Sequence, residues 1–124
     1  VSLRGCSMVA ADLSGAIAND CDFSEADLTG AKMFRIEAER SLFVRSVLRG
    51  ADVKSSKLMY AILDKAEIHG TDLRSANLFR ASLAKVRGDK ATKLESAYLV
   101  QILVVPEPNN KSVDLWSNPE KVIG

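Results

Sequence analysis

Few residues in this chain have side chains that could support catalysis or hold a metal ion. The sequence contains one histidine, His69, and two cysteines, Cys6 and Cys21. A structural zinc site takes four ligands, mostly cysteine and histidine, so this set is too small to form one. Aspartates recur at intervals that are multiples of five and could form an array of carboxylates; they are Asp12, Asp22, Asp27, Asp52 and Asp72. What these groups can do depends on the elements that position them.

The chain is organised in consecutive blocks of five residues from Val1 to Lys85. The clearest blocks read ADLSG from residue 11, ADLTG from residue 26 and TDLRS from residue 71. The third residue is apolar in all seventeen blocks, and the first is small in most of them. Neither a helix, with a period of 3.6 residues, nor a strand, with a period of two, produces this register. We therefore expect the first and third residues to point inward and the others outward.

This pattern of A, then D or N, then L and two variable residues resembles the pentapeptide repeat family. The resemblance implies an all-β fold, a right-handed quadrilateral parallel β-helix in which four blocks make one coil of twenty residues. Neighbouring coils of such a solenoid pair their backbones at a spacing of about 4.8 Å. The length of the repeat region predicts about five coils.

The register changes near the C-terminal end of the repeats. The block VRGDKA at residues 86–91 carries one extra residue, which a local bulge would accommodate, and Leu94 and Leu99 resume the pattern as third residues. We expect a β-helix over residues 1–105 and a non-repeat tail over 106–124, which begins with PEPNN. The apolar residues expected to form an irregular cap on the last coil are Val113, Leu115, Trp116 and Val122.

A filled interior excludes most enzyme functions, because it leaves no cleft for a substrate. We predict no catalytic residue, cofactor, metal ligand or small-molecule substrate. His69 falls at an outward position between Arg49 and Asp89 at the spacing of one coil, which favours a surface ion pair over a catalytic base. Cys6 and Cys21 fall at inward first positions and should pack as small apolar side chains. The aspartates fall at second positions, where they should cap backbone donors in turns.

Charge and hydropathy limit the possible partners. Seventeen basic and sixteen acidic residues give a net charge of +1, and no apolar run approaches the ~20 residues of a membrane span. We therefore predict a cytoplasmic protein with no membrane span. Basic residues exceed acidic ones between residues 41 and 93, but we expect them on several different faces, which argues against nucleic acid as a partner.

Apolar residues at outward positions indicate a surface for a protein partner. Leu42 and Ile62 follow one another in a second-position column, Met59 and Phe79 in a fourth-position column, and Tyr60 lies at the corner between these columns. The fifth-position column places Tyr60 between two arginines, either as a self-satisfied ladder with cation–ring stacking or as part of a binding hot spot. The predicted interface comprises Arg40, Leu42, Met59, Tyr60, Ile62, Phe79 and Arg80.

The family resemblance implies two classes of role. One is an acidic rod that mimics DNA and binds DNA gyrase, as in quinolone-resistance proteins, but the basic middle of this chain departs from that pattern. The other is a rigid module joined to another domain. The run ANLFRASL, followed by a degenerate block and TKLESAYL, is similar to pentapeptide tails of effector-loading adaptors of type VI secretion. We predict a non-enzymatic protein-binding scaffold from the C-terminal part of such a larger protein, with an effector or secretion component as its partner; the alternative is a gyrase-binding DNA mimic.

Overall fold

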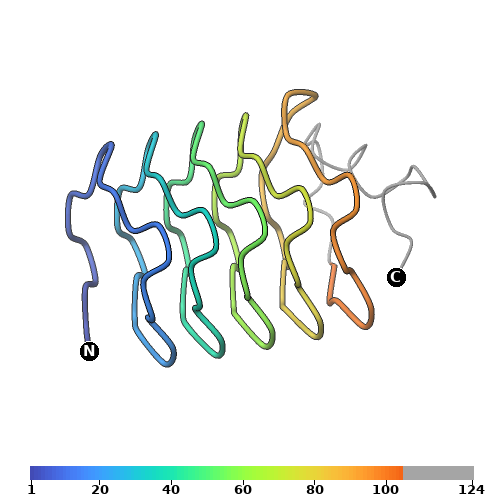
Figure 1. Cartoon of the computed structure of the whole chain (residues 1–124), viewed down its shortest axis with the longest axis horizontal. Coiled ribbons are helices and arrows are strands. Elements are labelled where there is room, and N and C mark those ends of the chain that lie inside the picture. Colours follow the sequence, from blue (N-terminus) through green and yellow to red (C-terminus); the bar gives the residue numbers. More distant parts are fainter. Residues whose placement is uncertain (105–124) are drawn as a thin grey trace.

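The molecule is a stack of similar coils that lie side by side along its long axis (Figure 1). The computed structural model describes residues 1–104. In that segment there is no helix, and strand pairing consists of isolated parallel bridges between residues one coil apart, such as Ser2 with Asp22 and Ser7 with Asp27. Every bridge joins two second residues of blocks, so each coil has four bridging sides. The expected all-β solenoid of about five coils is confirmed, while its right-handed sense stays a prediction.

Each block bends at its fifth residue, which adopts the left-handed backbone conformation. Gly5 and Gly15 fill this position without strain, but many blocks have larger residues there, such as Arg45 with φ of 56° and Tyr60 with φ of 62°. The turn closes when the next amide donates to the third carbonyl of the block, as Cys6 N does to Leu3 O at 3.1 Å. A chain that repeats this turn every five residues must wind into coils.

The aspartates at second positions support these turns. Oδ1 of Asp22 accepts a hydrogen bond from the Ser24 amide at 2.9 Å, and Asp27 binds the Thr29 amide in the same way at 3.1 Å. Asp12, Asp52 and Asp72 repeat the contact with the amide two residues later. The prediction that these carboxylates cap turns is confirmed.

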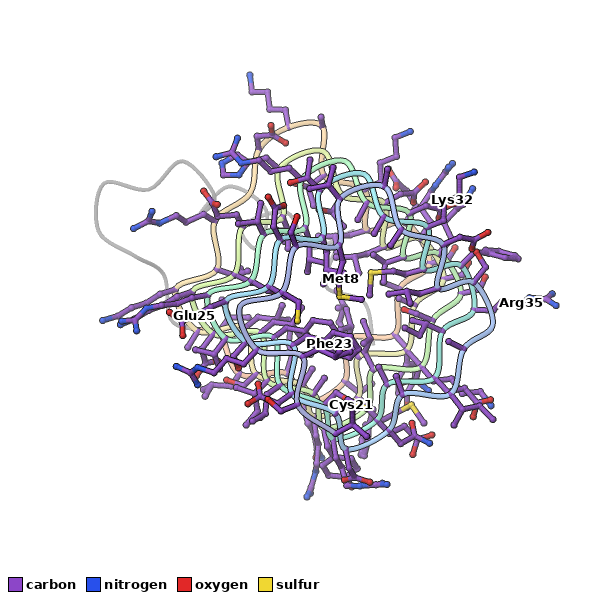
Figure 2. The ribbon with its side chains drawn as sticks, turned by 90° about the vertical axis from the view of Figure 1, so that its left-hand side faces the viewer. Met8, Cys21, Phe23, Glu25, Lys32 and Arg35 are labelled. Carbon is purple, nitrogen blue, oxygen red and sulfur yellow. The ribbon has the colours of Figure 1, made fainter. Side chains whose placement is uncertain are left out.

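The third residues of the blocks fill the axis of the stack. Phe23 and Phe43 lie one coil apart with their rings stacked, 4.9 Å between centroids and 8° from parallel. Figure 2, viewed along the axis from the first coil, shows Phe23 and Met8 pointing inward. Leu48 and Leu63 are buried, as the register predicts. The gap left in this interior measures only about 10 Å³ beside Phe43.

The prediction of buried cysteines is wrong for Cys6, which is exposed, and holds only partly for Cys21, which is half-buried. Both occupy inward first positions, but Cys6 belongs to the first coil, which is covered by another described coil on one side only. Leu3 and Met8 of the same coil are half-buried for the same reason.

The extra residue after Leu83 forms the expected bulge. The bridge spacing is twenty residues at Glu67 and Arg87 and becomes twenty-one at Asp72 and Lys93. In Figure 1 the coil that contains this insertion carries a wider loop than its neighbours. Within the loop, the Asp89 carboxylate accepts hydrogen bonds from the amides of Gly70 and Ala91, at 3.0 and 3.1 Å.

This use of Asp89 removes the ion pair expected for His69. Arg49 also finds another partner, because its guanidinium binds Glu67 at 2.9 Å. His69 is half-buried, and its Nδ1 atom is buried without a hydrogen-bond partner among residues 1–104. Among residues 1–104, His69 therefore forms no direct ion pair with Arg49 or Asp89, and the prediction is wrong on that contact. Although burial alone would raise the pKa of Asp89, the hydrogen bonds from the Gly70 and Ala91 amides hold it below its usual value, and the charge of His69 adds to this effect.

The predicted tail over residues 106–124 and its cap of Val113, Leu115, Trp116 and Val122 lie outside the described residues. In the described part of the chain, no helix is long and apolar enough to cross a membrane.

Candidate functional site

Backbone hydrogen bonds between coils bring the predicted interface residues together. The Tyr60 amide donates to the Phe79 carbonyl at 2.9 Å, and the Arg40 amide donates to the Met59 carbonyl at 3.0 Å. On the adjacent side, a parallel bridge joins Leu42 to Ile62. The register thus sets these outward columns next to each other at one corner of the stack.

Three aromatic rings contact one another at this corner. Tyr60 meets Phe79 edge to face, with 5.8 Å between centroids and an interplanar angle of 88°, and Phe79 lies 6.2 Å from the ring of Tyr98. Phe79 is half-buried between the other two, whereas Tyr60 and Tyr98 are 47% and 46% exposed. We call the surface of Met59, Tyr60, Ile62, Phe79, Arg80, Tyr98 and Leu103 the aromatic corner.

The arginines of the column do not sandwich the Tyr60 ring, so the expected stacking is wrong. Arg40 turns away to Asp20, with Nε and Nη2 donating to the carboxylate at 2.9 and 3.0 Å. The guanidinium of Arg80 lies over the Phe79 ring at 5.7 Å, and its Nε donates to Gln101 at 2.6 Å. The physical reason is that a carboxylate or amide oxygen one coil away binds a guanidinium better than an exposed ring does.

The Arg40–Asp20 contact also affects ionisation. Hydrogen bonds from the Arg40 side chain hold the pKa of Asp20 below its usual range, and the same contact raises the pKa of Arg40. Both groups are exposed, so solvent screens this pair, and Arg40 lies at the edge of the aromatic corner rather than in its centre.

The sequence prediction missed two members of this surface, Tyr98 and Leu103. Both follow the bulge, where the spacing between stacked residues is twenty-one, so that Tyr98 pairs with Asn77 and Leu103 with Ser82. Leu103 is 55% exposed. Applying the one-residue shift to the outward columns would have found both residues.

The described part of the chain holds no group of three histidine, cysteine or carboxylate side chains that could hold a metal ion. A second feature of its outer surface is an open hollow of about 470 Å³, lined by Arg45, Lys65, Glu67, Lys85 and Arg87. It lies at another corner of the coils, formed by the fifth residues of the blocks whose third residues are Phe43 and Leu63.

The family model of pentapeptide repeats matches residues 1–33 and 41–80 as eight copies. This chain belongs to the pentapeptide repeat family. The model match and the described coils rest on the same blocks of five. No curated protein matches the chain in sequence.

Solved structures of other pentapeptide repeat proteins are similar to this one. A protein from the cyanobacterium Cyanothece 51142 superposes with a TM-score of 0.71 at 19% identity, covering 86% of this chain and 91% of that one. A protein from the thylakoid lumen of Arabidopsis thaliana gives a TM-score of 0.55 at 22% identity, over 90% of this chain and 75% of that one. A protein from Nostoc PCC 7120 gives 0.52 at 21% identity, over 83% and 84% of the two chains. At these identities the likeness shows the fold alone.

Proposed function

We propose that this pentapeptide repeat protein is a non-enzymatic scaffold that binds a protein partner through the aromatic corner. The observation that supports this is the contact of three aromatic rings, two of them nearly half exposed, on a surface otherwise rich in charge. Tyrosine and arginine are enriched among residues that dominate binding energy. The aromatic rings of the corner are already held by the coils, so little side-chain freedom is lost when a partner binds.

The shape of this surface favours a protein over a small molecule. Small-molecule sites are concave and enclose most of the ligand. The aromatic corner is instead an outward bend of the chain, and Figure 2 shows that side chains radiate from such bends. A partner with an apolar cleft could close over Tyr60 and Tyr98 and leave Arg80 at the rim.

The wider role that we propose is that of a module in an effector-loading adaptor of type VI secretion, with an effector or secretion component as the partner. Its support is the similarity of residues 76–83 to the tails of such adaptors. The outward residues of that run include Phe79 and Arg80 of the aromatic corner. Reading the gene on both sides of the segment that encodes these residues would test this role, since the absence of any adaptor domain would contradict it.

A DNA-mimicking gyrase inhibitor remains the alternative, but no observation favours it. Such a mimic needs negative charge along the rod, whereas Arg45, Lys65 and Lys85 stack along one corner. In a supercoiling assay we expect no inhibition of gyrase at stoichiometric protein. Clear inhibition would replace the scaffold proposal by this alternative.

The direct test is to capture partners with the full chain from extract of the cells that produce it, identify and purify them, and measure their affinity. Tyr60→Ala should weaken binding by ~2 kcal/mol, about 30-fold in Kd, with unchanged melting temperature. Tyr98→Ala should act in the same direction. The matched control is Phe34→Ala, which removes a 38% exposed ring from a different side of the coil. Equal binding by the Tyr60 and Phe34 variants would reject the aromatic corner.

A further inference from the structure

Four basic side chains gather at a corner of the coils distinct from the aromatic corner. Arg45, Lys65, Lys85 and Arg87 line the open hollow of about 470 Å³, with Glu67 as the acidic member of its lining. We call these four residues the basic corner. Figure 2 shows nitrogen-tipped side chains projecting outward on the side where Glu25 is labelled, and Glu25 directly precedes Arg45 in the same column.

The backbone fixes the spacing of these cations. Arg45, Lys65 and Lys85 are fifth residues of successive coils, with φ of 56°, 60° and 55°, so all three leave the same kind of turn. The Arg45 amide donates to the Asp64 carbonyl at 2.9 Å, and the Lys65 amide donates to the Ala84 carbonyl at 2.8 Å. Successive side chains therefore start about 4.8 Å apart along the stack.

The nearby carboxylates do not neutralise this column. Glu67 binds Arg49 at 2.9 Å, outside the column. Asp64 accepts hydrogen bonds from the Ser82 hydroxyl at 2.5 Å and the Ala84 amide at 3.3 Å. Within residues 1–104, the side chains of Arg45, Lys65 and Lys85 form no ion pair. The column therefore presents three cationic side chains, those of Arg45, Lys65 and Lys85, to the hollow.

Four arginines elsewhere on the stack have acidic partners, and they are Arg4, Arg40, Arg49 and Arg74. In the column of the basic corner, Glu25 pairs with Arg4 at 2.5 Å. At the preceding corner of the coils, Arg40 pairs with Asp20 at 2.9 Å. Stacked like charges repel one another, and the repulsion is relieved when an anion binds among them. The binding of a multiply charged anion at the basic corner is therefore favourable.

We propose that the basic corner binds a ligand with adjacent phosphate groups. Arginine presents parallel N–H donors that match phosphate oxygens, and lysine binds phosphate as a point charge. An extended acidic peptide turns only every second side chain to one side, at a spacing of about 6.8 Å, and cannot match cations about 4.8 Å apart. A polyphosphate carries its charge more densely and can follow the column.

The length of the column limits the ligand. Three stacked cations extend over two coil spacings, about 10 Å, and Glu25 ends the column on the N-terminal side. A continuous track along duplex DNA is therefore not expected. A free polyphosphate or a nucleoside triphosphate fits this length, because its phosphates share bridging oxygens. The phosphates of single-stranded nucleic acid are separated by sugars and match the column no better than the carboxylates of a peptide.

The test is isothermal titration of the full chain with inorganic phosphate, pyrophosphate and tripolyphosphate at constant ionic strength. Affinity should rise with each added phosphate, because each reaches another cation. Arg45→Gln and Lys65→Gln should each raise the Kd for tripolyphosphate about tenfold, since bonds between charged groups are the strong class of hydrogen bond. A thymidine oligonucleotide is titrated in parallel. We expect it to bind more weakly than tripolyphosphate, because its phosphates are separated by sugars, and tighter binding that Arg45→Gln also weakens would assign the corner to nucleic acid backbone and overturn the proposal.

The matched control is Arg35→Gln. Arg35 is also a fifth residue, with φ of 59°, but it lies at another corner, where its guanidinium stacks on Phe34. Melting curves of all variants establish that they are folded. Three further results would overturn the proposal: equal affinity for phosphate and tripolyphosphate, an equal loss in the Arg35 variant, or equal binding of a pentaglutamate peptide. Each is independent of whether the aromatic corner binds a protein.

Discussion

The inner and outer columns of one side of the stack differ sharply in chemistry although they share one backbone. Inward, Phe23, Phe43 and Leu63 follow one another, and each is buried and apolar. Outward, the fifth residues of the same three blocks are Glu25, Arg45 and Lys65, and all are exposed. The inner column must meet the same packing requirement in every coil, whereas the outer column has to satisfy only the turn. The repeat therefore leaves the outer columns free to differ from coil to coil, and binding surfaces arise there.

The largest effect that this contrast predicts is at neighbouring residues 62 and 63. Leu63→Asp places a charge in the dry interior without a partner, which costs several kcal/mol and should unfold the chain. Ile62→Asp changes the preceding residue, which points outward. Its column, Asp22, Leu42 and Ile62, already contains an aspartate, so this variant should still melt cooperatively.

Thermal unfolding followed by circular dichroism checks both variants. A Leu63→Asp protein with nearly unchanged midpoint would contradict the register, and with it the assignment of inner and outer columns. If Ile62→Asp unfolded instead, the two sides of the chain would be reversed.

The inner columns were predictable from the sequence because burial requires the same residue type every five positions. The turn aspartates were also predictable, since the carboxylate of an aspartate at a second position reaches the amide two residues later. The partners of Arg40, Arg80 and Asp89 were not. Their partners depend on the direction that each side chain takes rather than on the register. The stack of Arg45, Lys65 and Lys85 could be predicted from their spacing of twenty residues. Finding it requires summing the charge of each outward column rather than of each segment of the chain.

A smaller effect distinguishes two buried serines at inward first positions. The Ser41 hydroxyl donates to the Ala18 carbonyl at 2.7 Å and accepts from the Cys21 amide at 3.2 Å, whereas the Ser56 hydroxyl has no hydrogen-bond partner among residues 1–104. Ser41→Ala should lower the free energy of unfolding by ~1 kcal/mol, because it removes the partner of two backbone groups in half-buried residues, the Cys21 amide and the Ala18 carbonyl. Ser56→Ala should leave it unchanged or raise it. Urea titrations of both variants measure the difference, and an equal loss in the two would show that both hydroxyls are hydrogen-bonded in solution.

Acid should weaken the outside of the stack and not its interior. Hydrogen bonds from Ser24 to Asp22, from Thr29 to Asp27 and from Arg74 to Asp72 hold the pKa of each carboxyl below its usual value. A lowered pKa in the folded chain stabilises it above the unfolded pKa, near 3.8, and this contribution disappears as the pH falls through the folded pKa. The buried polar side chains of residues 1–104 are serines and threonines, which do not ionise.

The ordinary pKa of an aspartate is about 4. The melting temperature should therefore not change through these carboxylates between about pH 7 and pH 5, and should fall below about pH 4. Asp72→Asn keeps an acceptor for the Arg74 amide but removes the charge, so its melting temperature should fall less steeply in acid. A steep loss of stability already at about pH 6 would contradict the assignment of the acid response to these aspartates.

The smallest effect is expected at Lys54, an outward residue whose Nζ lies 3.7 Å from Oδ2 of Asp52. The pair is exposed on both sides, so water and salt screen its attraction, and holding the long lysine side chain costs entropy that offsets what remains. Lys54→Ala should change the free energy of unfolding by no more than ~0.5 kcal/mol, because the turn itself depends on the Asp52 carboxylate and the Lys54 backbone amide, at 3.2 Å, which alanine retains. Urea unfolding at low and high salt measures this change. A loss above 1 kcal/mol that vanishes at high salt would mean that outward ion pairs help to hold the coils together, and the outer columns would then be less free to vary than their composition implies.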